Sequence, residues 1–166
     1  MTLNNYEIRE IQASELPCLE ELVYEAIFNP DPSNPYPQET IYEPNVIIYW
    51  DKWGSGKMDR CLVALEGDKV IGAVWCRLLN GNPKGYGYVN DGSPELTIAL
   101  YPEYRGQGIG TMLLRKLVQQ ATLDGFKGLS ISVTKGNPAL RLYAREGFSI
   151  VDDNEYDFIL YKSLQS

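Results

Sequence analysis

The pattern of apolar and polar residues divides the start of the chain into a strand, a helix and an irregular connection. Residues 6–11 alternate apolar and charged side chains, which is typical of a half-exposed strand. After Ser14, a suitable N-cap, apolar residues recur at helical spacing from about residue 15 to 28. Residues 29–37 contain four prolines, and each removes a backbone donor and restricts its predecessor, so a loop is predicted there.

Three further stretches complete the N-terminal half. Residues 38–53 are rich in Tyr, Ile and Trp and carry helical fragments interrupted by a proline. Residues 61–66 and 70–78 are rich in strand-forming residues around a short turn, which predicts a hairpin. Residues 80–94 form a long connection full of Gly, Asn and Pro, which is either a lid over a binding site or a solvent-exposed turn.

The C-terminal half alternates strands with helices. Its predicted elements are a strand over 95–100, a helix ending at Asp124-Gly125, a strand over 129–134, a short helix up to residue 146, and a hairpin of residues 148–151 and 156–162. This order contains one β-α-β unit among otherwise antiparallel neighbours. The sequence therefore predicts an α/β (α+β) fold, with a mixed, mostly antiparallel sheet in a single domain spanning residues 1–166.

Composition excludes several classes of protein. No apolar run approaches the roughly 20 residues that a membrane span requires, and no basic-then-apolar leader is visible, so a cytoplasmic protein is expected. The three cysteines lie far apart without a C-x-x-C spacing, and the chain has no histidine, so neither a disulfide framework nor a metal site is predicted. The net charge of −7 argues against a nucleic-acid partner and mildly favours a cationic one.

The most informative stretch follows the strand at 95–100. It reads Arg105-Gly106-Gln107-Gly108-Ile109-Gly110-Thr111, and we call it the glycine turn. Three glycines at alternate positions let the backbone approach a ligand, and the helix that follows directs its unpaired N–H groups and positive dipole end toward the turn. This is an anion-binding arrangement. A dinucleotide fingerprint is excluded because Thr111 stands where its last glycine belongs, and a Walker loop is excluded because Gly-Lys-Ser/Thr is missing.

The remaining pattern, Arg105-x-x-Gly108-x-Gly110, resembles the acetyl-CoA signature of the GNAT superfamily of N-acetyltransferases. A second resemblance lies downstream, where residues 137–148 contain Asn, Ala, Tyr and Gly-Phe in the order of another segment of that family. The resemblance covers the C-terminal half well, whereas the N-terminal half shares only the order of elements. It implies a GNAT-type sheet flanked by about four helices, with a bulge that splays the fourth strand from the fifth.

The resemblance also implies how acetyl-CoA is bound. The N–H groups of Gly106, Gln107, Gly108, Ile109, Gly110 and Thr111 would meet the pyrophosphate, with Arg105 adding charge or bracing the turn. The pantetheine arm would run along the strand at Ile98, Ala99 and Leu100. Asn137 would cap its own helix, contact the pantetheine arm, or do both.

Two residues are predicted to carry the proton transfers, because no histidine is present to do so. By resemblance, Tyr143 is the general acid for the leaving thiolate; its alternative role is that of a packed aromatic residue. Glu95 is the predicted general base, because it begins the central strand on the face shared with Thr97 and Ala99. The alternative for Glu95 is a solvated carboxylate, or one that only attracts an ammonium group.

The predicted function is transfer of an acetyl group from acetyl-CoA to a primary amine by direct attack in a ternary complex. The alternative is a non-catalytic acyl-CoA binding or sensor domain of the same fold. The expected partner is a small amine, with the acidic charge favouring a cationic one, and no nucleic acid or membrane. Residues 156–161 would offer a sheet edge for a homodimer, which is common in the family.

Overall fold

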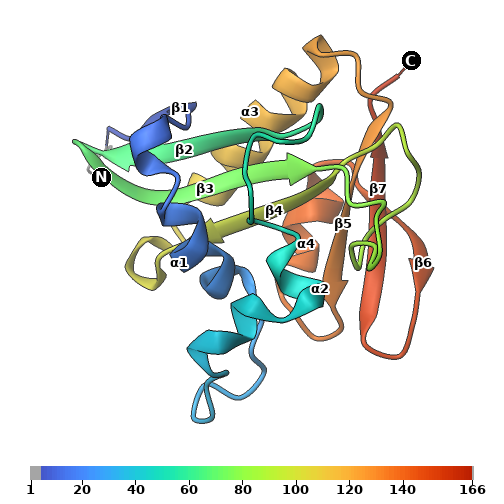
Figure 1. Cartoon of the computed structure of the whole chain (residues 1–166), viewed down its shortest axis with the longest axis horizontal. Helices are drawn as coiled ribbons and strands as arrows, with labels where there is room; N and C mark the ends of the chain where they lie inside the picture. Colours follow the sequence, from blue (N-terminus) through green and yellow to red (C-terminus); the bar gives the residue numbers. More distant parts are fainter. Residues whose placement is uncertain (1–4, 166) are drawn as a thin grey trace.

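The structure, a computed structural model, describes residues 5–165. One seven-stranded sheet runs through these residues (Figure 1). The strand order is β1-β2-β3-β4-β5-β7-β6, and every neighbouring pair is antiparallel except β4 and β5. The strands are β1 (Glu7–Glu10), β2 (Arg60–Glu66), β3 (Lys69–Arg77), β4 (Glu95–Leu100), β5 (Gly128–Thr134), β6 (Ser149–Asp153) and β7 (Asp157–Ser163). The predicted mixed, mostly antiparallel sheet is confirmed.

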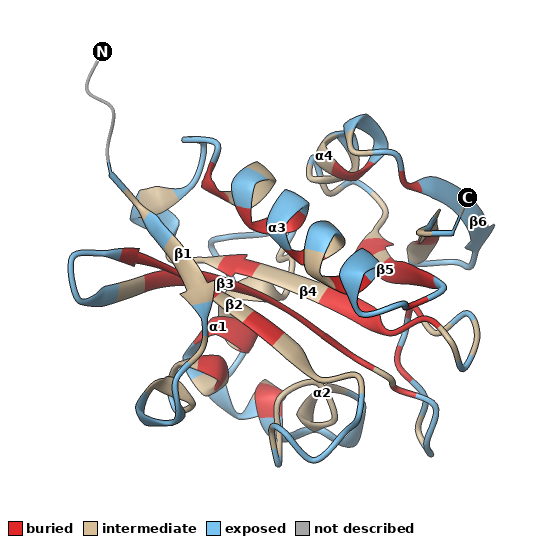
Figure 2. Ribbon diagram, turned by 90° about the horizontal axis from the view of Figure 1, so that it is seen from above, coloured by how far each residue is buried: buried red, intermediate tan, exposed pale blue. Residues whose placement is uncertain are grey.

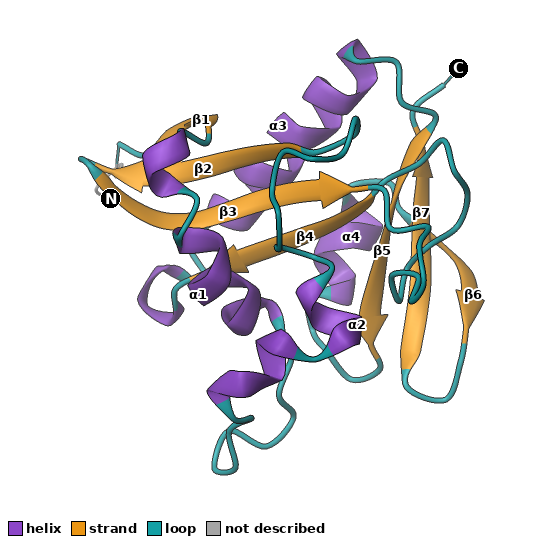
Figure 3. Ribbon diagram, viewed as in Figure 1, coloured by secondary structure: helices purple, strands orange, loops and turns teal. Residues whose placement is uncertain are grey.

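Four α-helices are present among the described residues, as predicted (Figure 3). They are α1 (Cys18–Ala26), α2 (Pro44–Ile47), α3 (Ile109–Leu123) and α4 (Leu140–Arg145), with 3-10 turns at Ala13–Glu15, Gln38–Tyr42 and Pro102–Tyr104. None of them is long and apolar enough to cross a membrane. The helix predicted over 15–28 is shorter at both ends, because Pro17 separates it from the turn at Ala13–Glu15 and Ile27 is already extended.

The helices cover both faces of the sheet, so the core has two layers (Figure 2). On one face, α3 and α4 bury a cluster that includes Leu96, Leu113 and Leu117. On the other face, α1 and the 38–50 segment bury a cluster that includes Leu22, Trp75 and Ala99. Each fully buried leucine stabilises the fold by roughly 1.5–3 kcal/mol. Because β4 contributes to both clusters, a shift of its pairing by one residue would exchange its two buried faces, so its register in the sheet is fixed.

The parallel pair β4 and β5 is joined over a very short length. Their register consists of Glu95 opposite Ser130, where the Ser130 N–H donates to the Pro94 carbonyl at 3.1 Å. Beyond this pair the two strands separate (Figure 1). The predicted splay is therefore present, whereas the bulge expected in this strand is not shown: β4 pairs with β3 through six residue pairs without a register shift.

The predicted dimer edge needs a correction. Residues 156–161 belong largely to β7, which lies between β5 and β6 and is hydrogen-bonded on both sides. The strand at this edge of the sheet is β6, whose residues are all exposed. The sequence pattern could not distinguish the two because both strands of the final hairpin carry the same mixture of apolar and polar residues.

Candidate active site

The glycine turn presents a row of unused main-chain donors. Among the described residues, the N–H groups of residues 106–111 have no acceptor within the protein, and the next one, on Met112, donates to the Gly108 carbonyl at 3.2 Å. The turn leads directly into the first turn of the 15-residue helix α3, whose N-terminal dipole adds partial positive charge. Free donors at a helix N-terminus form a site for an anionic group such as a diphosphate.

Two glycines of the turn are required by its backbone. Gly106 has a φ angle of 76° and Gly108 one of 84°, in the region that side chains disfavour. A Cβ added to either would meet no protein atom within 4 Å, so the space beside them is open to a ligand. Gly110 differs, because its φ is negative and an added Cβ would touch Leu142 and Leu100 at ordinary distances of 3.8 and 3.9 Å.

The polar side chains of the turn bind neighbouring protein groups, which holds the turn in place. Arg105 donates to the Leu100 carbonyl at 3.2 Å and forms an ion pair with Glu25 at 3.1 Å. The Gln107 side chain donates to the Glu103 carbonyl and accepts a hydrogen bond from Tyr6 at 2.9 Å. Of the two roles considered for Arg105, these contacts favour bracing, which leaves the main chain as the source of anion-binding groups.

The main chain of β4 supplies donors and acceptors in the gap before β5. The Tyr101 N–H donates to Ile71 of β3, and main-chain groups alternate in direction along an antiparallel strand. The main-chain N–H and C=O groups of Ala99 therefore point toward β3, whereas those of Ile98 and Leu100 point toward the gap. The Ala99 side chain is buried against α1. Of the three strand positions proposed for the pantetheine arm, Ile98 thus directs both main-chain groups toward the gap without a protein partner among the described residues, whereas Leu100 offers its N–H group because its carbonyl already accepts from Arg105.

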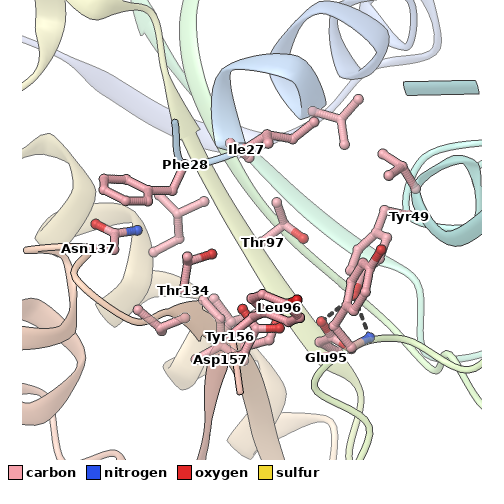
Figure 4. Close-up of a pocket in the computed structure, with 18 of the residues that line it drawn as sticks. Ile27, Phe28, Tyr49, Glu95, Leu96, Thr97, Thr134, Asn137, Tyr156 and Asp157 are labelled. Carbon is pink, nitrogen blue, oxygen red and sulfur yellow. Dashed lines mark hydrogen bonds between the residues drawn. The ribbon is translucent and has the colours of Figure 1, made fainter. Parts of the chain in front are cut away.

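The gap between β4 and β5 opens into a cavity of about 490 Å³. It is lined by residues from α1, the 36–49 segment, the 80–94 loop, β4, β5 and the start of β7, and it includes Tyr49, Glu95, Thr97, Asn137, Tyr143 and Asp157. Figure 4 shows Asn137 beside Phe28, well away from Tyr49 and Glu95. The cavity thus extends from the α4 side of the splayed strands to the carboxylate at the start of β4.

Glu95 is a buried carboxylate with a perturbed proton affinity. Its side chain is only 3% exposed, so the solvated alternative is wrong. One carboxylate oxygen accepts a hydrogen bond from the Tyr49 hydroxyl at 2.5 Å, and the other accepts one from the Gly87 N–H at 2.9 Å (Figure 4). Burial raises the pKa of Glu95 to about 7, because its penalty on the charged form outweighs the two hydrogen bonds.

The 80–94 loop is built into this end of the cavity. The Tyr86 N–H donates to the Tyr49 hydroxyl at 2.9 Å, and the two tyrosine rings stack with centroids 6.5 Å apart. A Cβ on Gly85 would lie 2.2 Å from Glu95, and one on Gly87 would lie 2.7 Å from the main chain of Ser132. Both positions therefore exclude a side chain. These contacts argue against the solvent-exposed turn, and the lid over the binding site stays a prediction.

Tyr143 lies inside the cavity with its hydroxyl unused. Its side chain is 6% exposed and packs edge-on against Phe148, and no protein group among the described residues bonds its hydroxyl. Among the described residues, Ser130 Oγ is the one inaccessible side-chain polar atom without a partner, so the unpaired Tyr143 hydroxyl reaches accessible space. Burial raises the pKa of Tyr143, which keeps the phenol protonated at neutral pH.

Asn137 caps the turn before α4. Its side-chain oxygen accepts a hydrogen bond from the Ala139 N–H at 2.9 Å, and α4 itself begins at Leu140, later than predicted. The side-chain nitrogen has no partner among the described residues and faces the cavity (Figure 4). Both predicted roles of Asn137 are therefore compatible with its position.

Sequence reasoning missed several cavity residues, among them the polar residues Glu43, Tyr49 and Asp157. They come from two segments that are distant from the glycine turn in the sequence. Glu43 and Tyr49 both lie within residues 38–53, where no motif marks either of them. The position of Tyr49 in the site depends on its side-chain hydrogen bond to Glu95, 46 residues away.

Comparison with known proteins agrees with this geometry. The Acetyltransferase (GNAT) family matches residues 22–148. The [ribosomal protein bS18]-alanine N-acetyltransferase of Haemophilus influenzae is 33% identical over 121 residues, which cover 69% of this chain and 76% of that protein. The probable N-acetyltransferase san of Drosophila melanogaster is 31% identical over 110 residues, covering 65% of this chain and 55% of the relative.

Solved structures share the fold over nearly the whole length. The PaiA N-acetyltransferase of Thermoplasma acidophilum, solved with coenzyme A, superposes with a TM-score of 0.69 at 21% identity, covering 96% of this chain and 99% of the other. The yncA putative acetyltransferase of Salmonella typhimurium, solved with acetyl-CoA, gives a TM-score of 0.68 at 17% identity, covering 98% and 95%.

The splayed parallel strands, the glycine turn and the family match together define the class: an acyltransferase domain of the GNAT type. The chain belongs to the GNAT acetyltransferase family. Because acetyl-CoA is the acetyl donor of this family, the prediction of an acetyl-CoA-dependent N-acetyltransferase is confirmed at the level of the family.

Proposed function

We propose that this protein transfers an acetyl group from acetyl-CoA directly to a primary amine, with Tyr143 as general acid and Glu95 as general base. The observation that carries the proposal is the order of the groups along one stretch of the chain. The unused N–H groups at residues 106–111 follow β4, whose residues 95–98 line the cavity that holds both Glu95 and Tyr143. An anionic group, a thioester and an amine can therefore be bound along β4 and the turn that follows it.

The chain offers complementary groups along the length of the coenzyme. The six N–H groups of the glycine turn suit a diphosphate. The exposed main-chain edge at Ile98 and Leu100 suits the amides of a pantetheine arm, which would bind like an added strand. The Asn137 side-chain nitrogen supplies a further donor at the α4 side of the cavity.

The two titratable groups have proton affinities suited to opposite roles. Burial raises the pKa of Glu95 to about 7, close to neutral pH, so its carboxylate is suited to take a proton from an ammonium group. Each carboxylate oxygen keeps a second acceptor position beyond its bond to Tyr49 or Gly87. Tyr143 holds its proton until a strong base, such as a departing thiolate, lies beside it.

Direct attack is favoured over an acetylated enzyme. No cysteine or lysine lines the cavity among the described residues, and the chain has no histidine to activate a serine or threonine. The three cysteines are elsewhere, and burial raises the pKa of Cys61 and Cys76 and keeps them as thiols. The amine itself is then the nucleophile.

The test is release of coenzyme A thiol from acetyl-CoA over a panel of amines, with acetylated product identified by mass. We expect amine-dependent release that saturates in both substrates, with intersecting lines in a two-substrate analysis. Parallel lines would indicate an acetyl-enzyme. Saturable acetyl-CoA binding with no release for any amine would instead identify a sensor domain.

A further inference from the structure

We propose that the acceptor is a small aliphatic diamine or polyamine, of which one nitrogen is acetylated while a second, cationic nitrogen is held by Asp157 and Glu43. This inference rests on the proposed function and adds the class of substrate. It comes from the charge and the hydrogen-bonding state of the groups that line the cavity.

The described residues that line the cavity include three acidic side chains and no lysine or arginine. The acidic residues are Glu43, which directly precedes α2, Glu95 of β4 and Asp157 of β7. The nearest basic residue along the chain is Lys135, which follows the lining residue Thr134. Its ammonium group is bound to Asp153 at 2.8 Å and lies over the Phe158 ring. The negative charge of the cavity is therefore available to a ligand.

The three carboxylates differ in their partners. Each oxygen of Glu95 already accepts one hydrogen bond, from Tyr49 or from Gly87. The carboxylates of Asp157 and Glu43 make no hydrogen bond or ion pair with the described residues. Asp157 is half-buried, and Figure 4 shows it beside Tyr156 and Leu96 on the cavity wall. One carboxylate is thus held for proton transfer, and two are free to bind a cation.

Two further observations indicate a polar ligand with an alkyl body. The Tyr143 hydroxyl is a nearly buried polar group that lines the same cavity without a partner. The outer rim carries three exposed phenol rings, Tyr36, Tyr86 and Tyr156, which are 40%, 50% and 69% exposed. Aromatic faces attract alkylammonium groups and cover methylene chains.

The reaction balances with this assignment. The reacting ammonium group loses one proton to Glu95, its lone pair forms the new N–C bond, and the C–S bond of acetyl-CoA breaks while Tyr143 gives its proton to the thiolate sulfur. The acetylated nitrogen then loses its second proton to the Tyr143 phenolate, and Glu95 releases its proton to solvent. The distal nitrogen keeps its proton throughout. Its charge contributes to binding and not to the chemical step, so loss of the second charge should raise KM more than it lowers kcat.

The experiment compares three acceptors that share one reacting amine and a four-carbon chain: 1,4-diaminobutane, butylamine and 4-aminobutanoate. They differ only in a far end that is cationic, neutral or anionic. We expect kcat/KM to be highest for the diamine, lower by about tenfold for butylamine, and lower again for the amino acid. A peptide with a free N-terminal alanine is included in the same assay.

Variants then assign the preference to the proposed residues. In Asp157→Asn and Glu43→Gln, the ratio of kcat/KM for diamine to that for butylamine should fall by about tenfold and severalfold, respectively. The ratio cancels any effect of Asp157 on the pKa of Glu95, because both acceptors depend on the same base. Asp68→Asn removes an equal charge from the exposed turn between β2 and β3 and should leave the ratio unchanged.

Equal kcat/KM for the diamine and butylamine, or a preference for the peptide over the diamine, would overturn this inference and leave the proposed acetyltransferase standing. Absence of turnover with every acceptor would refute the proposed function itself. In that case calorimetric binding of diamine and butylamine to the coenzyme A complex decides the inference: a diamine preference lost in Asp157→Asn supports it, and its absence refutes it.

Discussion

The coenzyme end and the acceptor end of the cavity are built in different ways. At the coenzyme end, the binding groups are main-chain N–H groups from one continuous stretch, residues 106–111, held by the geometry of a turn and a helix start. At the acceptor end, the binding groups are side chains from separate segments, among them Tyr49, Glu95 and Asp157. The first end depends on local backbone conformation, and the second on the packing of distant parts.

This difference has a physical consequence for specificity. A site made of main-chain donors tolerates change at its side chains as long as the backbone angles at Gly106 and Gly108 are kept. A site made of side chains changes its ligand whenever one residue is replaced. The coenzyme is therefore expected to be constant among related proteins, and the acceptor to vary with the carboxylates and phenols that face it.

The largest effect is expected where the two ends meet, at Tyr143. Replacing it by phenylalanine removes the only proton donor proposed for the thiolate, so kcat should fall by about 10²- to 10³-fold. The dissociation constant of acetyl-CoA should stay within about twofold, because the ring remains in place. Steady-state kinetics and calorimetry measure the two quantities.

Tyr101→Phe is the matched control, since it removes a phenol hydrogen bond to Glu21 outside the cavity. It should leave kcat unchanged. If Tyr143→Phe turned over as fast as the parent protein, the phenol would have only a packing role.

The next effect concerns the coenzyme end alone. Gly108→Ala places a Cβ on a residue with a φ of 84°, which costs about 1–2 kcal/mol and redirects the neighbouring N–H groups. We expect acetyl-CoA affinity to fall by about tenfold. Gly110→Ala is the control, because its Cβ fits between Leu142 and Leu100 and alanine favours the helix. Equal loss of affinity in both variants would show that the turn conformation is not what binds the coenzyme.

A smaller effect is expected at the acceptor end, from Tyr49→Phe. The Tyr49 hydroxyl stabilises the charged form of Glu95, so its removal should raise the pKa of the carboxyl further. Because the base acts when ionised, the acid limb of the kcat/KM profile, near pH 7 in the parent, should move to higher pH by about one unit. An acid limb that does not move would separate Glu95 from the proton transfer.

The fold and the coenzyme end were predictable because their determinants are local. Strand alternation at β5, the stop of α3 at Gly125 with a φ of 78°, and the spacing of Arg105, Gly108 and Gly110 each reflect backbone requirements within a few residues. Boundaries moved where one residue changed the local angles, as at Ile27. The final hairpin was found, but its order in the sheet was not, because strand order depends on long-range pairing.

The acceptor end was predictable only in part. Glu95 could be placed by its position on β4, yet its burial and its bond to Tyr49 depend on a loop that packs over it through Gly85 and Gly87. Nothing in the local pattern around Asp157 or Glu43 marks them as cavity residues. Their carboxylates become neighbours of the same space only after the chain has folded.

We expect the coenzyme to bind at the main-chain groups between residues 106 and 111 and along β4. This can be measured by titrating ¹⁵N-labelled protein with acetyl-CoA and following the amide chemical shifts. The largest shifts are expected at residues 106–111, Ile98 and Leu100, with none at the β6 edge. Saturable binding whose shifts lie away from the glycine turn and β4, or no binding at millimolar coenzyme, would contradict it.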